Sequence, residues 1–226
     1  MFQFVSIGGD CQPAAQIRKH RVSTASHFFD WIGIPIRQTI ALIENDFKGF
    51  LDRENMHPIF AGDGFYGIVD TRYRTDVRHE MSEFKPADIR TIQAMYALRS
   101  RWFMEMLEPD EPPVYLVRLW GLRDGDENEA DARELYEALR ARRRDIRLLY
   151  LHNDPTRGEL IEGAYRSSYL RQPTNPYSWQ GDDEAWRYAL NDFALRITEG
   201  PDEGFPLPRP RQPNFTTTRL RSRQIA

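Results

Sequence analysis

The chain has 226 residues, of which 40% are hydrophobic and 12% aromatic, enough for one large folded domain with its own core. Lys and Arg total 31 against 34 Asp and Glu, a net charge of −3, so the charge balance gives no reason to expect nucleic acid or an anionic membrane as a partner. One cysteine excludes an internal disulfide framework and a Cys-based zinc site, and without a signal-peptide pattern or an apolar run of about 18 residues we expect a cytoplasmic, bacterial-type protein with no membrane segment.

Apolar periodicity and turn residues divide the chain into alternating strands and helices. Gly8 and Gly9 end a short apolar run, and Pro13 then suits the first turn of a helix that closes on basic residues. In chain order the patterns predict a strand over 2–7, helices over 13–20 and 37–51, a loop region over 55–84 with a possible strand at 65–70, a helix over 86–107, a strand over 114–120, a helix over 125–144, a strand over 146–151, an irregular stretch over 153–181 and a helix over 182–197.

A strand, a helix and a second strand across 114–151 form a βαβ unit, which requires parallel pairing with a right-handed crossover. The predicted fold class is therefore α/β, a three-layer sandwich in which helices flank a small, mostly parallel sheet of about four strands. We expect a single domain over 1–200 and a Pro- and Arg-rich C-terminal tail over 201–226 that is extended or disordered.

The only cysteine, Cys11, follows two glycines in the stretch SIGGDCQPAAQ, at the predicted carboxyl edge of the sheet. The stretch lacks the G-x-G-x-x-G spacing and the Lys-Ser/Thr of a phosphate-binding loop. A helix N-terminus stabilises a thiolate, and N–H groups near Gly9, Asp10 and Gln12 could bind an oxyanion. The alternative is that Cys11 is a small buried side chain without chemistry, and its flanks leave both interpretations open.

A cysteine nucleophile needs a histidine to take its proton. His152 follows the strand at 146–151, at the sheet edge that also carries Cys11, while His79 precedes the long helix in a polar loop. No spacing rule chooses between them, because such groups meet in space and not in sequence. The acid that would orient the histidine is left open between Asp30, Asp76 and Asp154.

Phe29, Asp30 and Trp31 belong to a dense aromatic cluster. Core packing is the favoured interpretation, because large aromatic side chains dominate cores. The functional interpretation is the wall of a substrate cleft, with Asp30 orienting the catalytic histidine.

The segment SIGGDCQPAAQIRKHRVSTASHFFDW resembles the N-terminal signature of a bacterial family described as papain-like cysteine peptidases, domain of unknown function 1796. The matching positions are Ser6, Gly8, Cys11, Ala14, Arg18 and Phe29-Asp30-Trp31, then His79 after FYGIVD and Arg118 in VYLVRLW. The resemblance implies a cysteine hydrolase with Cys11 as nucleophile, His79 as base and Asp30 as the orienting acid. The strand-first order differs from papain, and GGDC is similar to the G-D-S loop of SGNH-type hydrolases, so the sandwich is expected to be Rossmann-like or SGNH-like.

The predicted substrate-binding residues are Gly9, Asp10, Gln12, Phe29, Trp31 and Arg118. No metal or cofactor is expected, and the substrate would be a small molecule or a peptide. Two alternatives remain: a non-catalytic binding module that uses the aromatic cleft, and a glycan- or nucleotide-sugar-processing protein in which Arg118 holds phosphate. Enzymatic activity and oligomeric state stay open on the sequence alone.

Overall fold

The computed structural model describes residues 3–20, 25–60, 66–81, 86–109, 114–120, 127–171 and 179–198, with the backbone alone at 78–81, 86–88 and 196–198. The predicted C-terminal tail over 201–226 lies outside the described residues. Those residues form two sheets and five helices, which confirms the α/β class.

The larger sheet holds the parallel strands that the sequence predicts. Its strands lie in the order β1 (Gln3–Ser6), β6 (Val114–Leu119), β7 (Arg147–His152), β9 (Tyr165–Tyr169) and β8 (Leu160–Glu162). The first four are parallel, and β8 is antiparallel at the edge. β6 and β7 are the strands of the predicted βαβ unit, and β1 joins the same sheet beside β6.

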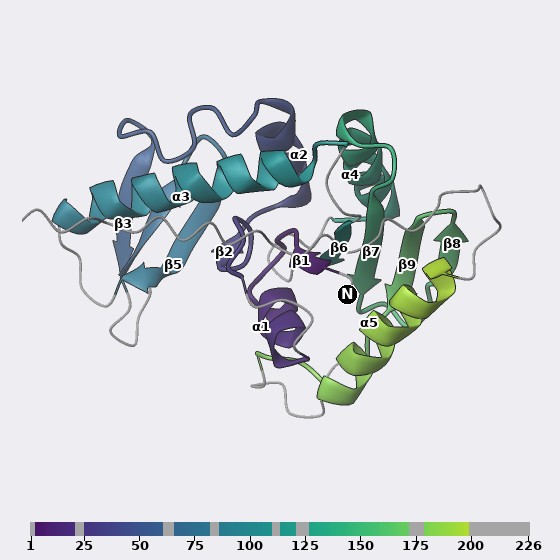
Figure 1. Ribbon diagram of the computed structural model, residues 1–226. Helices are drawn as coiled ribbons and strands as arrows, with labels where there is room; N and C mark the ends of the chain where they lie inside the picture. Colours follow the sequence, from purple (N-terminus) through teal and green to yellow (C-terminus); the bar gives the residue numbers. More distant parts are fainter. Residues whose placement is uncertain are drawn as a thin grey trace, which may run out of the picture.

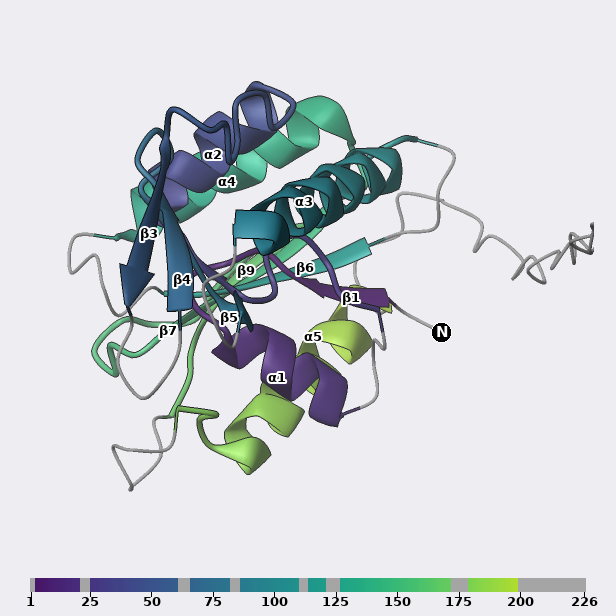
Figure 2. The ribbon, with the colours of Figure 1, turned by 90° about the vertical axis from the view of Figure 1, so that its left-hand side faces the viewer.

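Helices cover both faces of this sheet in three layers (Figures 1 and 2). One face carries α1 (Gln12–Lys19) and α5 (Asp183–Thr198), and the other carries α2 (Ile36–Glu44), α3 (Pro86–Met106) and α4 (Glu129–Arg142). This arrangement is the predicted sandwich. None of the helices within the described ranges is long and apolar enough to cross a membrane.

Two apolar cores fill the spaces between the layers. Alternate residues of β6 enter opposite cores, Val114 and Leu116 on the face of α2, α3 and α4, and Tyr115 and Val117 on the face of α1 and α5. All six residues of the strand are buried, as a strand between two helix layers requires. Arg118 follows the same alternation and is therefore a charged group within the first core.

A second, antiparallel sheet lies beside the first (Figure 1). Its order is β2 (Ile32–Gly33), β5 (Thr75–Met81), β4 (Tyr66–Asp70) and β3 (Met56–Phe60). Only β4 is predicted. The prediction of a loop around His79 is wrong, because His79 belongs to β5. The polar sequence TDVRHEM lacks the apolar alternation of a strand, and the strand forms by pairing of its backbone with β4 and β2.

Two other boundaries differ from the prediction. The helix expected over 37–51 ends at Glu44, because Asp46, Phe47 and Leu51 have φ of 51°, 60° and 56° and form tight turns that bury the two apolar side chains. The stretch expected to be irregular over 153–181 contains β8 and β9.

Candidate functional site

A two-glycine turn ends β1 and leads into α1. Gly8 and Gly9 have φ of 81° and 94°, in the left-handed region that favours glycine. A Cβ atom on Gly9 would lie 2.1 Å from the backbone oxygen of Leu119, and one on Gly8 would lie 2.7 Å from a methyl group of Ile34. Only glycines let the chain turn this close to the end of β6.

The turn delivers Cys11 to the N-terminus of α1. Cys11 is the N-cap residue, is partly exposed, and makes no capping hydrogen bond through its side chain. The cap comes from its neighbour, since Asp10 Oδ1 accepts a hydrogen bond of 2.7 Å from the N–H of Gln12. The thiol is therefore placed at the positive end of the helix dipole without being used to cap it.

The side chain of Gln12 is hydrogen-bonded to α5 and to the segment just before it. Its Nε2 donates to the backbone oxygen of Trp179 at 2.8 Å, and its Oε1 accepts from the indole N–H of Trp186 at 3.1 Å. Gln16 makes similar bonds one turn later, including one to Asp183. The predicted contact of Gln12 with substrate does not fit these bonds, which instead fix the position of α1.

Arg118 lies at the centre of a buried polar cluster that supports the turn. Its guanidinium donates to both carboxylate oxygens of Glu127, at 2.8 and 2.9 Å, to the backbone oxygens of Ile7 and Ile34, and to Thr39 Oγ1. The Arg118 and Glu127 side chains are 0% and 1% exposed. All five donor hydrogens are thus used within the protein, so the predicted roles of Arg118 in substrate or phosphate binding do not fit, and its role is to position Ile7 and Ile34.

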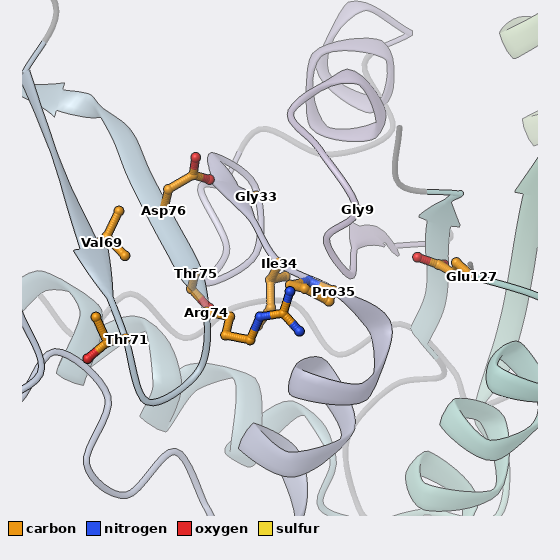
Figure 3. Close-up of a pocket in the computed structure, with 10 residues that line it drawn as sticks. All are labelled: Gly9, Gly33, Ile34, Pro35, Val69, Thr71, Arg74, Thr75, Asp76 and Glu127. Carbon is orange, nitrogen blue, oxygen red and sulfur yellow. The ribbon is translucent and has the colours of Figure 1, made fainter. Parts of the chain in front are cut away.

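A cavity of about 360 Å³ opens between the glycine turn and the β4–β5 hairpin. In Figure 3, Gly9 and Glu127 lie on one side and the hairpin residues on the other. Its lining residues are Gly9, Gly33, Ile34, Pro35, Val69, Thr71, Arg74, Thr75, Asp76 and Glu127. The cavity is within the size range of small-molecule sites and adjoins the loop that carries the cysteine.

The two candidate histidines occupy different parts of the molecule. His79 lies on β5, three residues after the cavity residue Asp76, and its side chain is outside the described part. His152 ends β7 and is 1% exposed, and neither of its ring nitrogens makes a hydrogen bond with good geometry to a described residue. Burial lowers the pKa of His152, and the charge of Arg157 lowers it further. Since β6 separates β7 from β1, His152 is about 10 Å from the strand that leads to Cys11.

Asp30 lies toward the far end of α1 from the cysteine. Its buried carboxylate accepts hydrogen bonds from the backbone N–H of His27 at 2.9 Å and from Arg18 at 3.3 Å. Burial raises the pKa of Asp30 to about 6, although His27 and Arg18 oppose the shift. Arg18 is seven residues beyond Cys11, about 10 Å along the helix, and also stacks over Trp31 at 4.8 Å. Asp30 and Trp31 therefore do not line the cavity beside Gly9.

Phe29 is fully buried in the larger core. Its ring packs edge-on against Phe28 and Phe103, with centroids 4.8 and 5.1 Å apart, and contacts Phe47 at 5.8 Å. The predicted contact of Phe29 with substrate does not fit, since no part of the ring reaches the surface.

Sequence reasoning names one residue on the hairpin side of the cavity, Asp76, and misses the others. Thr71, Arg74, Thr75 and Asp76 come from the turn TRYRTD and the start of β5. The available signal was a run of polar and positively charged residues directly after an apolar strand, which is typical of a hairpin tip. Asp154, the third candidate acid, accepts from the N–H and hydroxyl of Thr156 in its own turn.

Comparison with known families gives one family model that covers most of the chain. The family model described as "Putative papain-like cysteine peptidase (DUF1796)" matches residues 2–151. The matched segment contains the glycine turn, Cys11, both sides of the cavity and His79, and it ends just before His152. No curated protein and no solved structure matches the chain, and no cluster of three potential metal ligands occurs among the described residues. With more than half of its length matched, the chain belongs to the family described as putative papain-like cysteine peptidases.

Proposed function

We propose that the protein is a cysteine-dependent hydrolase or acyl transferase with Cys11 as nucleophile. One observation carries the proposal: the cysteine begins α1 directly after a glycine turn, and Gly9 of that turn lines a cavity of about 360 Å³. The helix N-terminus is an activating environment for a thiol, and the cavity, which Gly9 lines two residues before Cys11, has room for a substrate.

The chemistry has two steps. The proton of Cys11 passes to His79, the sulfur forms a bond with the acyl carbon, the bond to the leaving group breaks, and His79 returns the proton to the leaving group. Water activated by the same histidine then cleaves the thioester, giving a carboxylic acid and the free thiol. The N–H of Gln12 is occupied by Asp10, so backbone N–H groups from Gly9 to Cys11 are the remaining candidates for the oxyanion.

His79 is the preferred base. It lies on β5, the strand that also supplies Thr75 and Asp76 to the cavity, and it falls within the segment matched by the family model. His152 is about two strand spacings from β1 and outside that segment.

Asp76 is the preferred orienting acid. It is 7% exposed, lines the cavity, and lies on the strand that carries the proposed base. Asp30 is held by Arg18 toward the far end of α1, and Asp154 is engaged in its own surface turn.

The rate of alkylation of Cys11 by iodoacetamide, measured from pH 5 to 10, tests the assignment. We expect half-maximal alkylation well below about 8.5, the value of a free thiol, in the wild type, and a shift toward that value in His79→Gln. His57→Gln, at an exposed histidine on β3, is the matched control and leaves the profile unchanged. A free-thiol profile in the wild type, or a shift in His152→Gln alone, contradicts the proposed pair.

Turnover gives the second readout. Screening thioesters and activated esters with wild type and Cys11→Ser should show hydrolysis only in the wild type. Equal hydrolysis by both proteins rules out Cys11 as the nucleophile.

A further inference from the structure

We propose that Arg74 binds a carboxylate group on the substrate, so that the preferred acyl substrates are those that carry a carboxylate some atoms away from the reacting carbonyl. This inference rests on the proposed function of Cys11 and specifies the substrate class. It depends on the position of Arg74, on the way its turn is held and on the charges around the cavity.

Arg74 lies on the wall of the cavity opposite the glycine turn. It belongs to the hairpin turn between β4 and β5 and lines the cavity with Gly9, Ile34 and Pro35. Figure 3 shows its guanidinium extending from the hairpin toward Ile34 and Pro35, on the side where Gly9 lies. A substrate in the cavity would therefore lie between a positive group and the loop that carries the nucleophile.

Buried contacts hold the hairpin turn in place. The fully buried carboxylate of Asp70 accepts hydrogen bonds from the backbone N–H groups of Tyr73 at 2.9 Å and Leu51 at 2.6 Å. The hydroxyl of Tyr73 donates to the backbone oxygen of Lys48 at 2.6 Å. These bonds hold the hairpin turn against the segment that follows α2, and they fix the backbone of Arg74, the residue after Tyr73.

Arg74 itself has a φ of 48°. A residue other than glycine in this left-handed region costs about 1–3 kcal/mol and persists only where the surroundings impose it. Here the buried Asp70 and Tyr73 impose it, and the result is an arginine whose backbone direction is set in advance. A backbone fixed in advance lowers the conformational freedom that is lost when the residue binds a ligand.

The charges around the cavity favour a single carboxylate. Arg74 makes no ion pair with any acid in the described ranges, whereas the Glu127 carboxylate on the opposite wall is already neutralised by Arg118. Asp76 adds a second acid to the lining, which disfavours a doubly charged ligand such as a phosphate monoester. A guanidinium and a carboxylate form two parallel hydrogen bonds, so the two groups match in charge and geometry.

Paired alkylating reagents test the inference on the full-length protein. Iodoacetate, N-bromoacetyl-glycine and N-bromoacetyl-4-aminobutyrate place a carboxylate at increasing distances from the carbon that reacts with Cys11, and the amide of each acid is its neutral partner. The measured quantity is the ratio of acid to amide alkylation rates at each length. We expect the wild-type ratio to exceed that of Arg74→Gln by about three- to tenfold at one length or more, with Arg74→Lys in between.

Arg72→Gln is the matched control, because Arg72 is an exposed arginine of the same turn that does not line the cavity. It should keep the wild-type ratios. Equal ratios in wild type and Arg74→Gln at all three lengths overturn the inference. Slow reaction of Cys11 with the neutral amides contradicts the proposed role of Cys11 as nucleophile. The ratio of acid to amide rates still tests the role of Arg74 in that case. If Cys11 is not alkylated at all, calorimetric titration with 4-acetamidobutyrate decides, and binding that does not depend on Arg74 overturns the inference.

Discussion

Replacing Arg118 by methionine should be among the most destabilising single changes in this protein. The substitution keeps most of the side-chain volume but leaves the Glu127 carboxylate, whose side chain is 1% exposed, without its positive partner. It also removes the donors to the backbone oxygens of Ile7 and Ile34. Removing one partner of a buried ion pair typically costs about 3–5 kcal/mol. Since domains of this kind have a free energy of unfolding of about 5–15 kcal/mol, the loss should take away about a fifth of it or more.

Urea denaturation followed by tryptophan fluorescence measures this loss. Arg133→Met is the matched control, because Arg133 pairs with Glu162 at 2.7 Å but both side chains are nearly half exposed. A surface pair of this kind contributes at most about 1 kcal/mol. The double variant Arg118→Met with Glu127→Met should recover part of the loss, since it removes the stranded charge.

The reasoning is refuted if Arg118→Met loses no more stability than Arg133→Met. It is also refuted if the double variant is less stable than Arg118→Met alone, because the cost would then come from packing and not from the unpaired carboxylate.

The remaining predictions concern the turn, the pH dependence of stability and the strained arginine. Gly9→Ala should lose at least about 2 kcal/mol of unfolding free energy, because the added methyl group would lie 2.1 Å from a backbone oxygen. Gly163→Ala, with open space around its Cβ, should lose about 1 kcal/mol. Equal losses in urea denaturation would contradict the close approach at Gly9. Burial raises the pKa of Asp30 from 3.8 to about 6, which adds stability at low pH that is lost as the pH rises through 6. Burial lowers the pKa of His27 from 6.5 to about 4, which adds stability at higher pH that is lost as the pH falls toward 4. The urea midpoint should therefore rise more steeply from pH 4 to 6.5 in Asp30→Asn than in wild type and less steeply in His27→Gln, and unchanged slopes would argue against both shifts. Arg74→Gly should raise the unfolding free energy by about 0.5–1 kcal/mol, because glycine adopts a φ of 48° without strain, yet lose the preference for acidic reagents; a loss of stability would show that the turn is not strained.

Local sequence signals predict three of the four parallel strands and the helices on both faces of the sheet, but not β9. The strands around Arg118 and Tyr150 are continuous apolar runs, and α4 begins at an N-cap, Asn128, whose side chain and that of Asp131 form a capping box. Such signals act over a few residues and do not depend on the rest of the fold. The position of Cys11 at the carboxyl edge follows from them directly.

Local sequence signals do not predict the antiparallel sheet, or the wall of the cavity that the β4–β5 hairpin forms. The strand β5 has polar residues where an isolated strand would need apolar ones, and β3 contains Pro58, which argues against a strand. Both strands pair with β4, one on either side. The turn that carries Arg74 is held by a contact between residues 19 positions apart, the hydrogen bond from the Leu51 N–H to Asp70. Arg118 illustrates the opposite error, since a charged residue near the end of a strand suggests a ligand-binding role until its five buried hydrogen bonds are known.

The pairing of β1 with β6 has a consequence for how the protein matures. Gln3 lies opposite Val114, so the N-terminal strand waits for more than a hundred residues to leave the ribosome before its neighbour exists. Closing so long a stretch of chain is slow compared with forming a helix or a hairpin. The turn at Gly9 lies against the end of β6, so the proposed nucleophile gains its surroundings only when β1 and β6 have paired. The thiol therefore lacks its reaction site until more than half of the chain has been synthesised.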